Sequence, residues 1–374
     1  MNVLLVIEAA DGGCGLHVLD LAAGLAKRGH KVTLVYSPLR AGDWFIKAAH
    51  KLPLHRCEPL DMAWAVGPSD LTTYFRLRQF VKQYGPYDII HSHSSKAGAL
   101  CRALPKRYAK ATIYTPHGIR TIDPNLGDLP RFIYGTIEKV LGRWRSDALI
   151  PVSMVEKAHI DDAGMAPNRT YLVHNGLAKH MPLSRRDARR EMGIEESEVI
   201  AGFVGRLADP KNPARFVEAV NIARESAPSL RGIVIGDGPL KASAEEKNTQ
   251  HAVSFLGARK AAALMPGFDF LVMTSSYEAM PYTLLEALHA RLPIISTRVG
   301  GTAETIIEGE NGYTIEVDAP PKALADTITS LALDNEKRAT FAAASAKLAQ
   351  ARTDDTMVDA TLEVYAQAMA NRRN

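Results

Sequence analysis

The sequence predicts an α/β protein made of two doubly wound domains, and three observations lead to this prediction. The chain has 374 residues, which is more than one ordinary hydrophobic core supports. Short β-branched runs alternate with helical patterns in both halves, which is typical of parallel sheets covered by helices on both faces. A polar, interrupted segment at residues 175–186 separates the two series and predicts a linker.

The first half predicts one sheet and its helices. Strands are expected near residues 2–8, 31–36, 87–92, 111–115, 147–152 and 170–173. Helices are expected near residues 15–28, 69–83, 95–107, 130–145 and 153–163. Because ligands of such sheets bind at the carboxyl ends of the strands, the residues that follow each strand are the candidates for function.

The second half predicts another sheet and a returning helix. Strands are expected near residues 198–204, 231–236, 252–256, 269–273 and 293–297, and only helical patterns follow Tyr313. An apolar stripe in the last helix, near residues 355–370, must be buried on a domain already formed, and a return to the first domain would bury it. The stripe consists of Val358, Leu362, Tyr365 and Met369. The predicted domains are residues 1–178 with 355–374, and residues 179–354, with the active site in a cleft between them.

Residues 271–304 carry the most informative pattern: a buried strand, a loop with Glu278, a helix, a second strand and a Gly300-Gly301 turn. Proline is preferred in the first turn of a helix, so the helix is expected to begin at about Pro281. Glu278 then lies in the preceding loop and Glu286 in the second turn.

The start of this helix predicts an anion site. We expect the backbone N–H groups of Thr283 and Leu284 to be free and to bind a phosphate, aided by the helix macrodipole. With a carboxylate on each side of the phosphate, the pattern predicts a nucleotide-sugar site.

Other strand ends in the second half carry cations and glycines. Arg206 and Lys211, on one loop, are expected to hold a diphosphate from two sides, although a solvated charged loop is the alternative. The backbone around Gly257 and Arg259 is expected to hold the edge of a nucleobase. The alternative is that these glycine turns only end strands and bind nothing.

The first half offers weaker motifs. Gly13, in Gly12-Gly13-Cys14-Gly15, either approaches a phosphate or forms a tight turn, and the spacing is not a dinucleotide fingerprint. His117 ends one strand and is expected to bond a sugar hydroxyl or a phosphate oxygen, unless it is structural. His93 and Lys96 follow the neighbouring strand and are expected to contact the acceptor. The His-x-His pair lacks a third ligand at useful spacing, so no metal site is predicted.

Charge and hydropathy restrict the partners. Residues 1–180 hold 23 basic against 15 acidic side chains (+8), and the remainder holds 22 against 26 (−4). A basic first half suits an anionic membrane or a lipid diphosphate, and a solvated surface explains it equally well. No basic stretch interleaves with aromatics, so nucleic acid is not expected. The absence of a membrane-length apolar run or signal peptide predicts a cytoplasmic protein.

Taken in order, these motifs resemble the retaining glycosyltransferases of the GT4 family. The fold of that family, GT-B, has two facing Rossmann-like domains and a C-terminal helix that returns to the first. The most specific motif is Glu-x7-Glu, here Glu278 and Glu286, followed by Gly300-Gly301-x-x-Glu304. Further matches are Gly12-Gly13, Gly29-His30-Lys31-Val32, His117, Arg206, Lys211 and Gly236-Asp237-Gly238-Pro239.

The resemblance implies roles for these residues. Arg206 and Lys211 would neutralise the donor diphosphate, and Glu286 would bind the nucleotide ribose. Glu278 would touch the transferred sugar, and His117 would lie beside the reaction centre. Backbone near Thr283 and Leu284 would also touch phosphate.

The family's same-face mechanism, in which the leaving diphosphate helps to deprotonate the acceptor, is also implied. It needs no cofactor beyond the donor, a UDP- or GDP-sugar. No Asp-x-Asp motif ends a predicted strand, so no divalent metal is expected.

Departures from the family pattern concern the donor. Ala279-Met280-Pro281 replaces a glycine-containing turn, which leaves the transferred sugar open. Residues 91–98, 115–118 and 131–153 resemble the branch that builds surface polysaccharides on lipid diphosphates. A lipid-linked glycan acceptor at the inner membrane face is therefore expected, with a soluble acceptor as the alternative. Basic residues next to apolar ones agree with a membrane surface: Arg102, Lys106, Arg107 and Lys110.

Two other functions remain open from the sequence. A GT-B sugar-nucleotide epimerase would use the same donor without an acceptor. A non-catalytic nucleotide-sugar binding module would keep the donor site alone, although the joint presence of Glu278, Glu286, Arg206, Lys211 and His117 argues against it.

Overall fold

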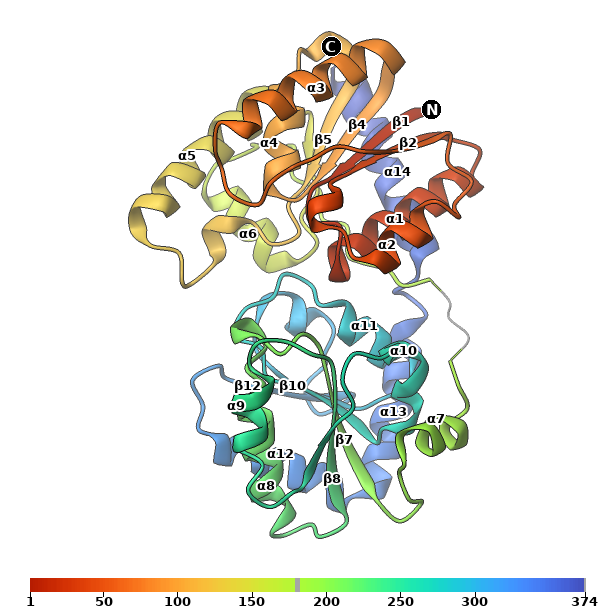
Figure 1. Ribbon diagram of the computed structural model, residues 1–374, viewed down its shortest axis with the longest axis vertical. Helices are drawn as coiled ribbons and strands as arrows, with labels where there is room; N and C mark the ends of the chain where they lie inside the picture. Colours follow the sequence, from red (N-terminus) through yellow and green to blue (C-terminus); the bar gives the residue numbers. More distant parts are fainter. Residues whose placement is uncertain (179–181, 373–374) are drawn as a thin grey trace. The chain divides into compact units, whose positions relative to one another are not determined.

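The computed structural model describes residues 1–178 and 182–372 (Figure 1). The chain divides into two compact units: unit 1 is Met1–Ala178 with Thr353–Asn374, and unit 2 is Lys179–Arg352. Residues 179–181 of the predicted linker and residues 373–374 of the predicted first domain lie outside the described residues.

Unit 1 is built on a parallel sheet whose six described strands have the order β3-β2-β1-β4-β5-β6. The strands are β1 (Asn2–Ile7), β2 (Lys31–Tyr36), β3 (Arg56–Pro59), β4 (Tyr87–His93), β5 (Ala109–Thr115) and β6 (Ala148–Leu149). The helices are α1 (Gly12–Lys27), α2 (Asp43–Ala49), α3 (Ser69–Tyr84), α4 (Ser95–Ala103), α5 (Asp128–Arg145), α6 (Met154–Asp162) and α14 (Asp354–Asn371), with 3-10 turns η1 (Pro38–Arg40), η2 (Lys106–Tyr108) and η3 (Arg120–Ile122).

The core of unit 1 covers both faces of this sheet, as a central parallel strand requires. Val3, Leu5 and Ile7 of β1 pack in one cluster with α1 and α14, and Leu4 and Val6 pack in another with α3 and α4. Figure 1 shows these helix groups on opposite faces. The alternation follows from the two-residue period of a strand.

The last helix of the chain belongs to unit 1, which confirms the predicted return. Val358 and Tyr365 are fully buried in the cluster with α1, and Leu362 and Met369 are partly buried against it. Gly24 of α1 has no Cβ, and one placed there would lie 2.5 Å from the Val358 side chain, so glycine permits the close helix contact.

Unit 2 contains a second parallel sheet, whose described strands have the order β12-β11-β10-β7-β8-β9. The strands are β7 (Val199–Val204), β8 (Leu230–Ile235), β9 (Val253–Phe255), β10 (Phe270–Met273), β11 (Ile294–Thr297) and β12 (Gly312–Ile315). The helices are α7 (Arg185–Met192), α8 (Pro213–Arg224), α9 (Lys241–Glu246), α10 (Ala261–Leu264), α11 (Tyr282–His289), α12 (Pro321–Leu333) and α13 (Asn335–Ala349), with 3-10 turns η4 (Asp209–Lys211), η5 (Met265–Gly267) and η6 (Gly300–Glu304).

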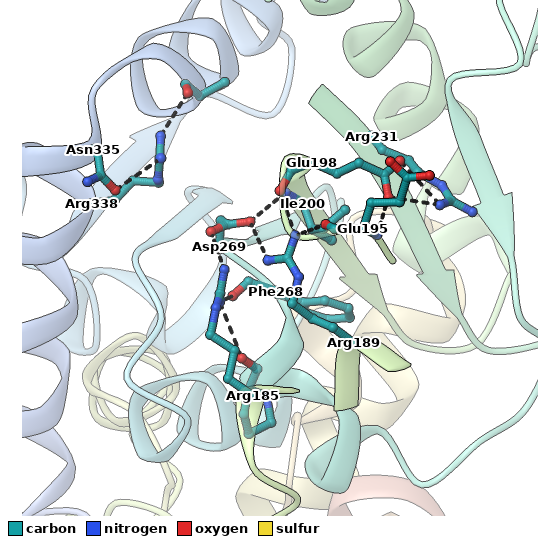
Figure 2. Close-up of polar contacts among 12 residues, drawn as sticks. Arg185, Arg189, Glu195, Glu198, Ile200, Arg231, Phe268, Asp269, Asn335 and Arg338 are labelled. Atoms are coloured by element: carbon teal, nitrogen blue, oxygen red, sulfur yellow. Dashed lines mark hydrogen bonds and ion pairs between the residues drawn. The ribbon is translucent and has the colours of Figure 1, made fainter. Parts of the chain in front are cut away.

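Helix α7 corrects the predicted linker, because residues 185 and 186 already belong to a helix docked on unit 2. Asp269, just before β10, accepts from Arg185 Nη2 at 2.7 Å, from Arg189 Nη1 at 3.4 Å and from the Ile200 amide at 2.7 Å (Figure 2). One carboxylate therefore holds α7, β7 and the start of β10 together.

Several short elements differ from the predictions. The edge strands β3 and β12 and the seven-residue helix α2 were not expected, because each is too short to show a clear period. Residues 170–173 form one isolated bridge to Leu149 instead of a strand. Helix α4 ends at Ala103, before Pro105, which disfavours helical conformation in the residue that precedes it.

Replacement of Asp269 by alanine tests its structural role. Arg189 is 2% exposed and would lose its charged partner, so we expect the free energy of unfolding to fall by about 3–5 kcal/mol. Urea unfolding followed by circular dichroism measures the loss, and hydrogen exchange should rise in α7. Asp326→Ala, which breaks the exposed pair with Lys322, is the control and should change stability by less than about 1 kcal/mol. Equal effects of both variants would refute the role.

Candidate functional site

The candidate residues of unit 2 follow from its strand order. The order reverses between β7 and β10, and this switch point is where doubly wound sheets bind ligands. Arg206 and Lys211 follow β7, and Glu278 follows β10. The sheet therefore brings to one edge residues that are about 70 positions apart in the chain.

Lys211 and Glu278 form an ion pair at this edge, between Nζ and Oε1. The Thr274 hydroxyl, next to the end of β10, donates to the carbonyl oxygens of Lys211 at 2.9 Å and Asn212 at 2.8 Å. The Ser275 hydroxyl donates to Glu278 Oε1 at 2.8 Å. One short segment after β10 thus holds the backbone of Lys211 and the carboxylate of Glu278 by hydrogen bonds.

The glycine turn after β11 packs against the Glu278 loop. Gly300 has φ of +46°, and a Cβ there would lie 2.1 Å from the Glu278 carbonyl oxygen. The Gly301 amide donates to the Ala279 carbonyl oxygen at 2.7 Å. Glycine is required because of both the backbone conformation and the close approach, so the Gly-Gly motif positions the loop that carries Glu278.

Helix α11 begins at Tyr282, one residue later than predicted, and Pro281 is its N-cap. The Leu284 amide donates to the Pro281 carbonyl oxygen at 3.1 Å. The prediction of a free Leu284 amide is therefore wrong, because the extended proline turns its carbonyl into the first turn. Of the two expected amides, Thr283 is the one left as a candidate for an anion.

Glu286 lies in the second turn of α11 and is half-buried. Burial raises the pKa of its carboxyl group to about 7, although the positive charge of Lys211 opposes the rise. Lys211 therefore influences both acidic residues of the Glu-x7-Glu motif.

The other residues predicted to bind the donor lie in the loops after β7 and β9 of unit 2. Arg206 and Arg259 are exposed. Gly257, with φ of +69°, accepts from the Gly236 amide at 2.9 Å through its carbonyl oxygen, and Arg259 Nε donates to the Leu256 carbonyl oxygen at 3.2 Å. The two turns after β8 and β9 therefore support each other.

The carboxyl edge of the unit 1 sheet carries Gly13, in the first turn of α1, and His117, after β5. His117 has φ of +56°, which is uncommon for a side-chain-bearing residue and marks candidate functional sites. The buried Glu156 carboxylate holds the loop by accepting from the Gly118 amide at 2.8 Å and the Ile119 amide at 2.9 Å. Glu156 was not predicted.

Three imidazoles meet at this edge: those of His17, His93 and His117. His93 Nδ1 lies 3.0 Å from His117 Nε2, and His17 Nδ1 lies 3.0 Å from Asn175 Oδ1. Burial lowers the pKa of His17 to about 4 and also lowers the pKa values of His93 and His117, so all three are neutral near pH 7. His93 is fully buried and contacts the half-buried His117, so it can affect a ligand only through its neighbours.

A pocket of about 860 Å³ lies next to Lys96 in unit 1. Lys96 Nζ pairs with Asp70 at 2.6 Å. The polar lining of the pocket includes Glu8, Arg40, Ser94 and Lys96. The apolar lining of the pocket includes Trp64, Leu71, Tyr74, Ile137 and Leu141. The pocket therefore has a charged part near the ends of β1 and β4 and an apolar part between α3 and α5.

Arg102 corrects the predicted basic face. It is buried, pairs with Glu138 of α5 at 2.8 Å and lies over the Tyr114 ring at 3.9 Å. Lys106, Arg107 and Lys110 are exposed, as a surface role requires. Arg102 instead fixes α5 to α4.

His17 and Glu156 are the residues that sequence reasoning missed. His17 lies in the second turn of the helix after the glycine turn, and Glu156 lies in the first turn of α6. Their proximity to the ends of predicted strands was the available signal. Neither has a local motif, because their partners are distant in the sequence.

Comparison with known families decides the identity of the chain. The family model "Glycosyltransferase Family 4" matches residues 11–178, and "Glycosyl transferases group 1" matches residues 184–348. The chain belongs to the GT4-type glycosyltransferases.

Relatives and solved structures agree with this assignment. N-acetyl-alpha-D-glucosaminyl L-malate synthase of Bacillus anthracis is 28% identical over 346 residues, covering 87% of this chain and 86% of the relative. D-inositol 3-phosphate glycosyltransferase of Corynebacterium urealyticum is 28% identical over 289 residues, covering 70% and 68%.

Among solved structures, Anabaena HepE in complex with UDP and glucose has a TM-score of 0.81 at 20% identity, covering 98% of this chain and 99% of that one. WaaG, a glycosyltransferase involved in lipopolysaccharide biosynthesis, has a TM-score of 0.78 at 19% identity, with the same coverage. These likenesses confirm the GT-B fold. Within residues 1–178 and 182–372, no helix of this glycosyltransferase is long and apolar enough to cross a membrane.

Replacement of Glu286 by glutamine tests the pKa of this carboxyl group. Because its pKa is raised, deprotonation of Glu286 costs free energy in the folded glycosyltransferase. The folded state therefore loses stability relative to the unfolded state as the pH rises through about 7. The free energy of unfolding of Glu286→Gln relative to the wild type should therefore increase by about 1–3 kcal/mol from pH 5 to pH 9. Urea unfolding at the two pH values measures it. The exposed Glu246→Gln is the control, and a difference independent of pH would contradict the assignment.

Proposed function

We propose that this GT4-type protein is a retaining, metal-independent glycosyltransferase that moves a sugar from a UDP- or GDP-sugar to a glycan acceptor. The observation that carries the proposal is the Lys211–Glu278 ion pair at the switch point of unit 2, with Arg206 exposed on the same loop as Lys211. A cation pair suits a diphosphate, and a carboxylate next to it suits sugar hydroxyls.

Donor binding changes the partners of this pair. A diphosphate carries more negative charge than one carboxylate, so it would attract Lys211 away from Glu278. Glu278 would then accept hydrogen bonds from the transferred sugar, while Glu286 binds the ribose. The complex of HepE with UDP and glucose supports a uridine donor, and the fold is the same at 20% identity.

The proposed chemistry relies on orientation and charge stabilisation. The leaving diphosphate helps to deprotonate the acceptor hydroxyl on the same face of the sugar, which retains the anomeric configuration. Arg206 and Lys211 stabilise the charge that develops on the phosphate. These two cations, and the lack of an Asp-x-Asp motif at a strand end, support a reaction without a divalent metal.

The acceptor in this proposal is linked to a lipid diphosphate. The unit 1 pocket supports it, since its charged lining suits a polar headgroup and its apolar lining suits a hydrocarbon chain. WaaG, a structural neighbour, is involved in lipopolysaccharide biosynthesis. A role in surface polysaccharide synthesis at the cytoplasmic face of the membrane follows from such an acceptor.

Helix α5 supports association with an anionic membrane, because it exposes large apolar side chains that a helix on the surface of a globular domain normally buries. It buries Glu138 and Gly142 and exposes a stripe of large apolar residues. The most exposed are Phe132 at 72%, Leu129 at 69% and Trp144 at 67%. Lys139 and Arg143 are exposed on the same helix. An exposed apolar stripe with cations beside it is typical of a helix that lies in a membrane interface.

Substitutions in unit 2 and unit 1 should separate donor binding from turnover. Lys211→Ala and Glu286→Ala should each weaken donor binding, the lysine variant by about 10- to 100-fold, because charge-assisted hydrogen bonds are lost. His117→Ala should lower kcat and leave donor affinity unchanged. Calorimetric titration with UDP and GDP measures binding, and release of nucleoside diphosphate from a panel of their sugars measures turnover.

The exposed Lys322→Ala is the control for charge and should behave as the wild type. Full activity in Lys211→Ala, Glu286→Ala and His117→Ala would refute the site. An isomerised donor without release of nucleoside diphosphate would favour the epimerase. Donor binding without either product would favour the non-catalytic module.

The membrane proposal predicts binding to liposomes through α5. Wild-type protein should sediment with phosphatidylglycerol-containing liposomes at low salt and be released at high salt, because screening weakens the attraction of exposed cations. The double variant Phe132→Ser with Trp144→Ser should bind at least about tenfold more weakly, because buried apolar area is lost.

Leu333→Ser removes an equally exposed apolar residue of unit 2 and is the matched control. Equal binding by the double variant and the wild type would place the membrane contact elsewhere. No sedimentation at low salt would refute membrane association.

A further inference from the structure

The histidine cluster of unit 1, formed by His17, His93 and His117, has no assigned ligand. One ring nitrogen from each residue lies within 4.8 Å of the others. The residues come from α1, from the last position of β4 and from the loop after β5, so the fold assembles the cluster. We propose that this cluster binds a zinc-type divalent ion, and that the bound ion inhibits glycosyl transfer by occupying His117.

The environment of His17 leaves one nitrogen available as a ligand. Its Nδ1 lies 3.0 Å from Asn175 Oδ1. An amide oxygen can only accept, so Nδ1 carries the proton and Nε2 keeps its lone pair. This is the arrangement of metal-binding histidines, whose second nitrogen is usually held by a protein oxygen.

His93 and His117 already have a spacing close to that of two ligands. Their nitrogens lie 3.0 Å apart, and two Zn–N bonds of about 2.0–2.1 Å in a tetrahedron place the nitrogens about 3.3 Å apart. Metal binding through His93 Nδ1 leaves the proton of this ring on Nε2, which is buried and has no hydrogen-bond partner among the described residues. The spacing of the two ligand nitrogens is therefore the observation on these residues that supports the site.

The chemistry of the three ligands selects the ion. Neutral imidazoles suit Zn²⁺, Co²⁺ and Ni²⁺, whereas Mg²⁺ and Ca²⁺ prefer oxygen ligands. His117 is half-buried, which leaves a fourth position for water. His91 is not a ligand, because its nitrogens are bonded to Tyr365 at 2.7 Å and Thr115 at 2.8 Å.

Metal binding can be measured without any assay of activity. Chelator-treated protein should take up one equivalent of Zn²⁺ in competition with a chromophoric chelator, should give a Co²⁺ absorption spectrum, and should ignore Mg²⁺. His17→Gln and His93→Gln should each lower Zn²⁺ affinity at least tenfold. Asn175→Ala keeps all three imidazoles and should lower it by about 10- to 100-fold. Circular dichroism checks that each variant is folded.

The exposed His55→Gln is the matched control and should bind Zn²⁺ as the wild type does. Absence of Zn²⁺ binding would overturn the proposal. So would equal Zn²⁺ affinity in His17→Gln, Asn175→Ala and the wild type, which would indicate adventitious binding at surface histidines.

The inhibitory part of the proposal rests on the proposed glycosyl transfer. Zn²⁺ should inhibit the wild type, EDTA should restore its activity, and inhibition should weaken in Asn175→Ala. Binding without inhibition would overturn the inhibitory role. An EDTA-treated enzyme that is inactive until Zn²⁺ is added would overturn both inhibition and the proposed metal independence. Transfer activity without Zn²⁺ binding would overturn the site and leave the proposed function intact.

Discussion

The ion pair between Lys211 and Glu278 is the interaction on which the arrangement of loops at the switch point of unit 2 depends. Both side chains are mostly shielded from solvent. When no ligand is bound, each would therefore be an uncompensated charge without the other. Thr274 and Ser275 hold the two loops from one segment after β10, and the Gly300-Gly301 turn supports the Glu278 loop. Much of residues 271–304 therefore serves to place one carboxylate against one ammonium group.

Unit 1 uses the same sheet edge for a different chemistry. Its switch point carries neutral imidazoles and buried carboxylates instead of free cations, because burial lowers the pKa values of His17, His93 and His117. A neutral imidazole can bond a hydroxyl in either direction, which suits an acceptor better than a diphosphate. The two units therefore present different strand-end residues on the same strand order.

The sequence predicted the fold and the strand-end candidates because both depend on local patterns. Buried strands such as β1, β4 and β10 have clear hydrophobic runs, and Lys211, Glu278 and His117 lie in the loops that follow such strands. The short edge strands β3 and β12 lacked a readable period. His17 and Glu156 escaped prediction because their partners are distant in sequence. The Leu284 amide was mistaken for free, since the carbonyl direction of Pro281 cannot be read from residue types.

In the proposed function, Lys211 exchanges Glu278 for the donor diphosphate. A crystal structure of the protein with UDP-glucose, or with the nucleotide sugar that binds most tightly, would show whether this exchange occurs. We expect Lys211 Nζ to lie within hydrogen-bond distance of a diphosphate oxygen, with Glu278 released toward the sugar. A structure in which Lys211 still pairs with Glu278 while the diphosphate binds elsewhere would contradict the exchange.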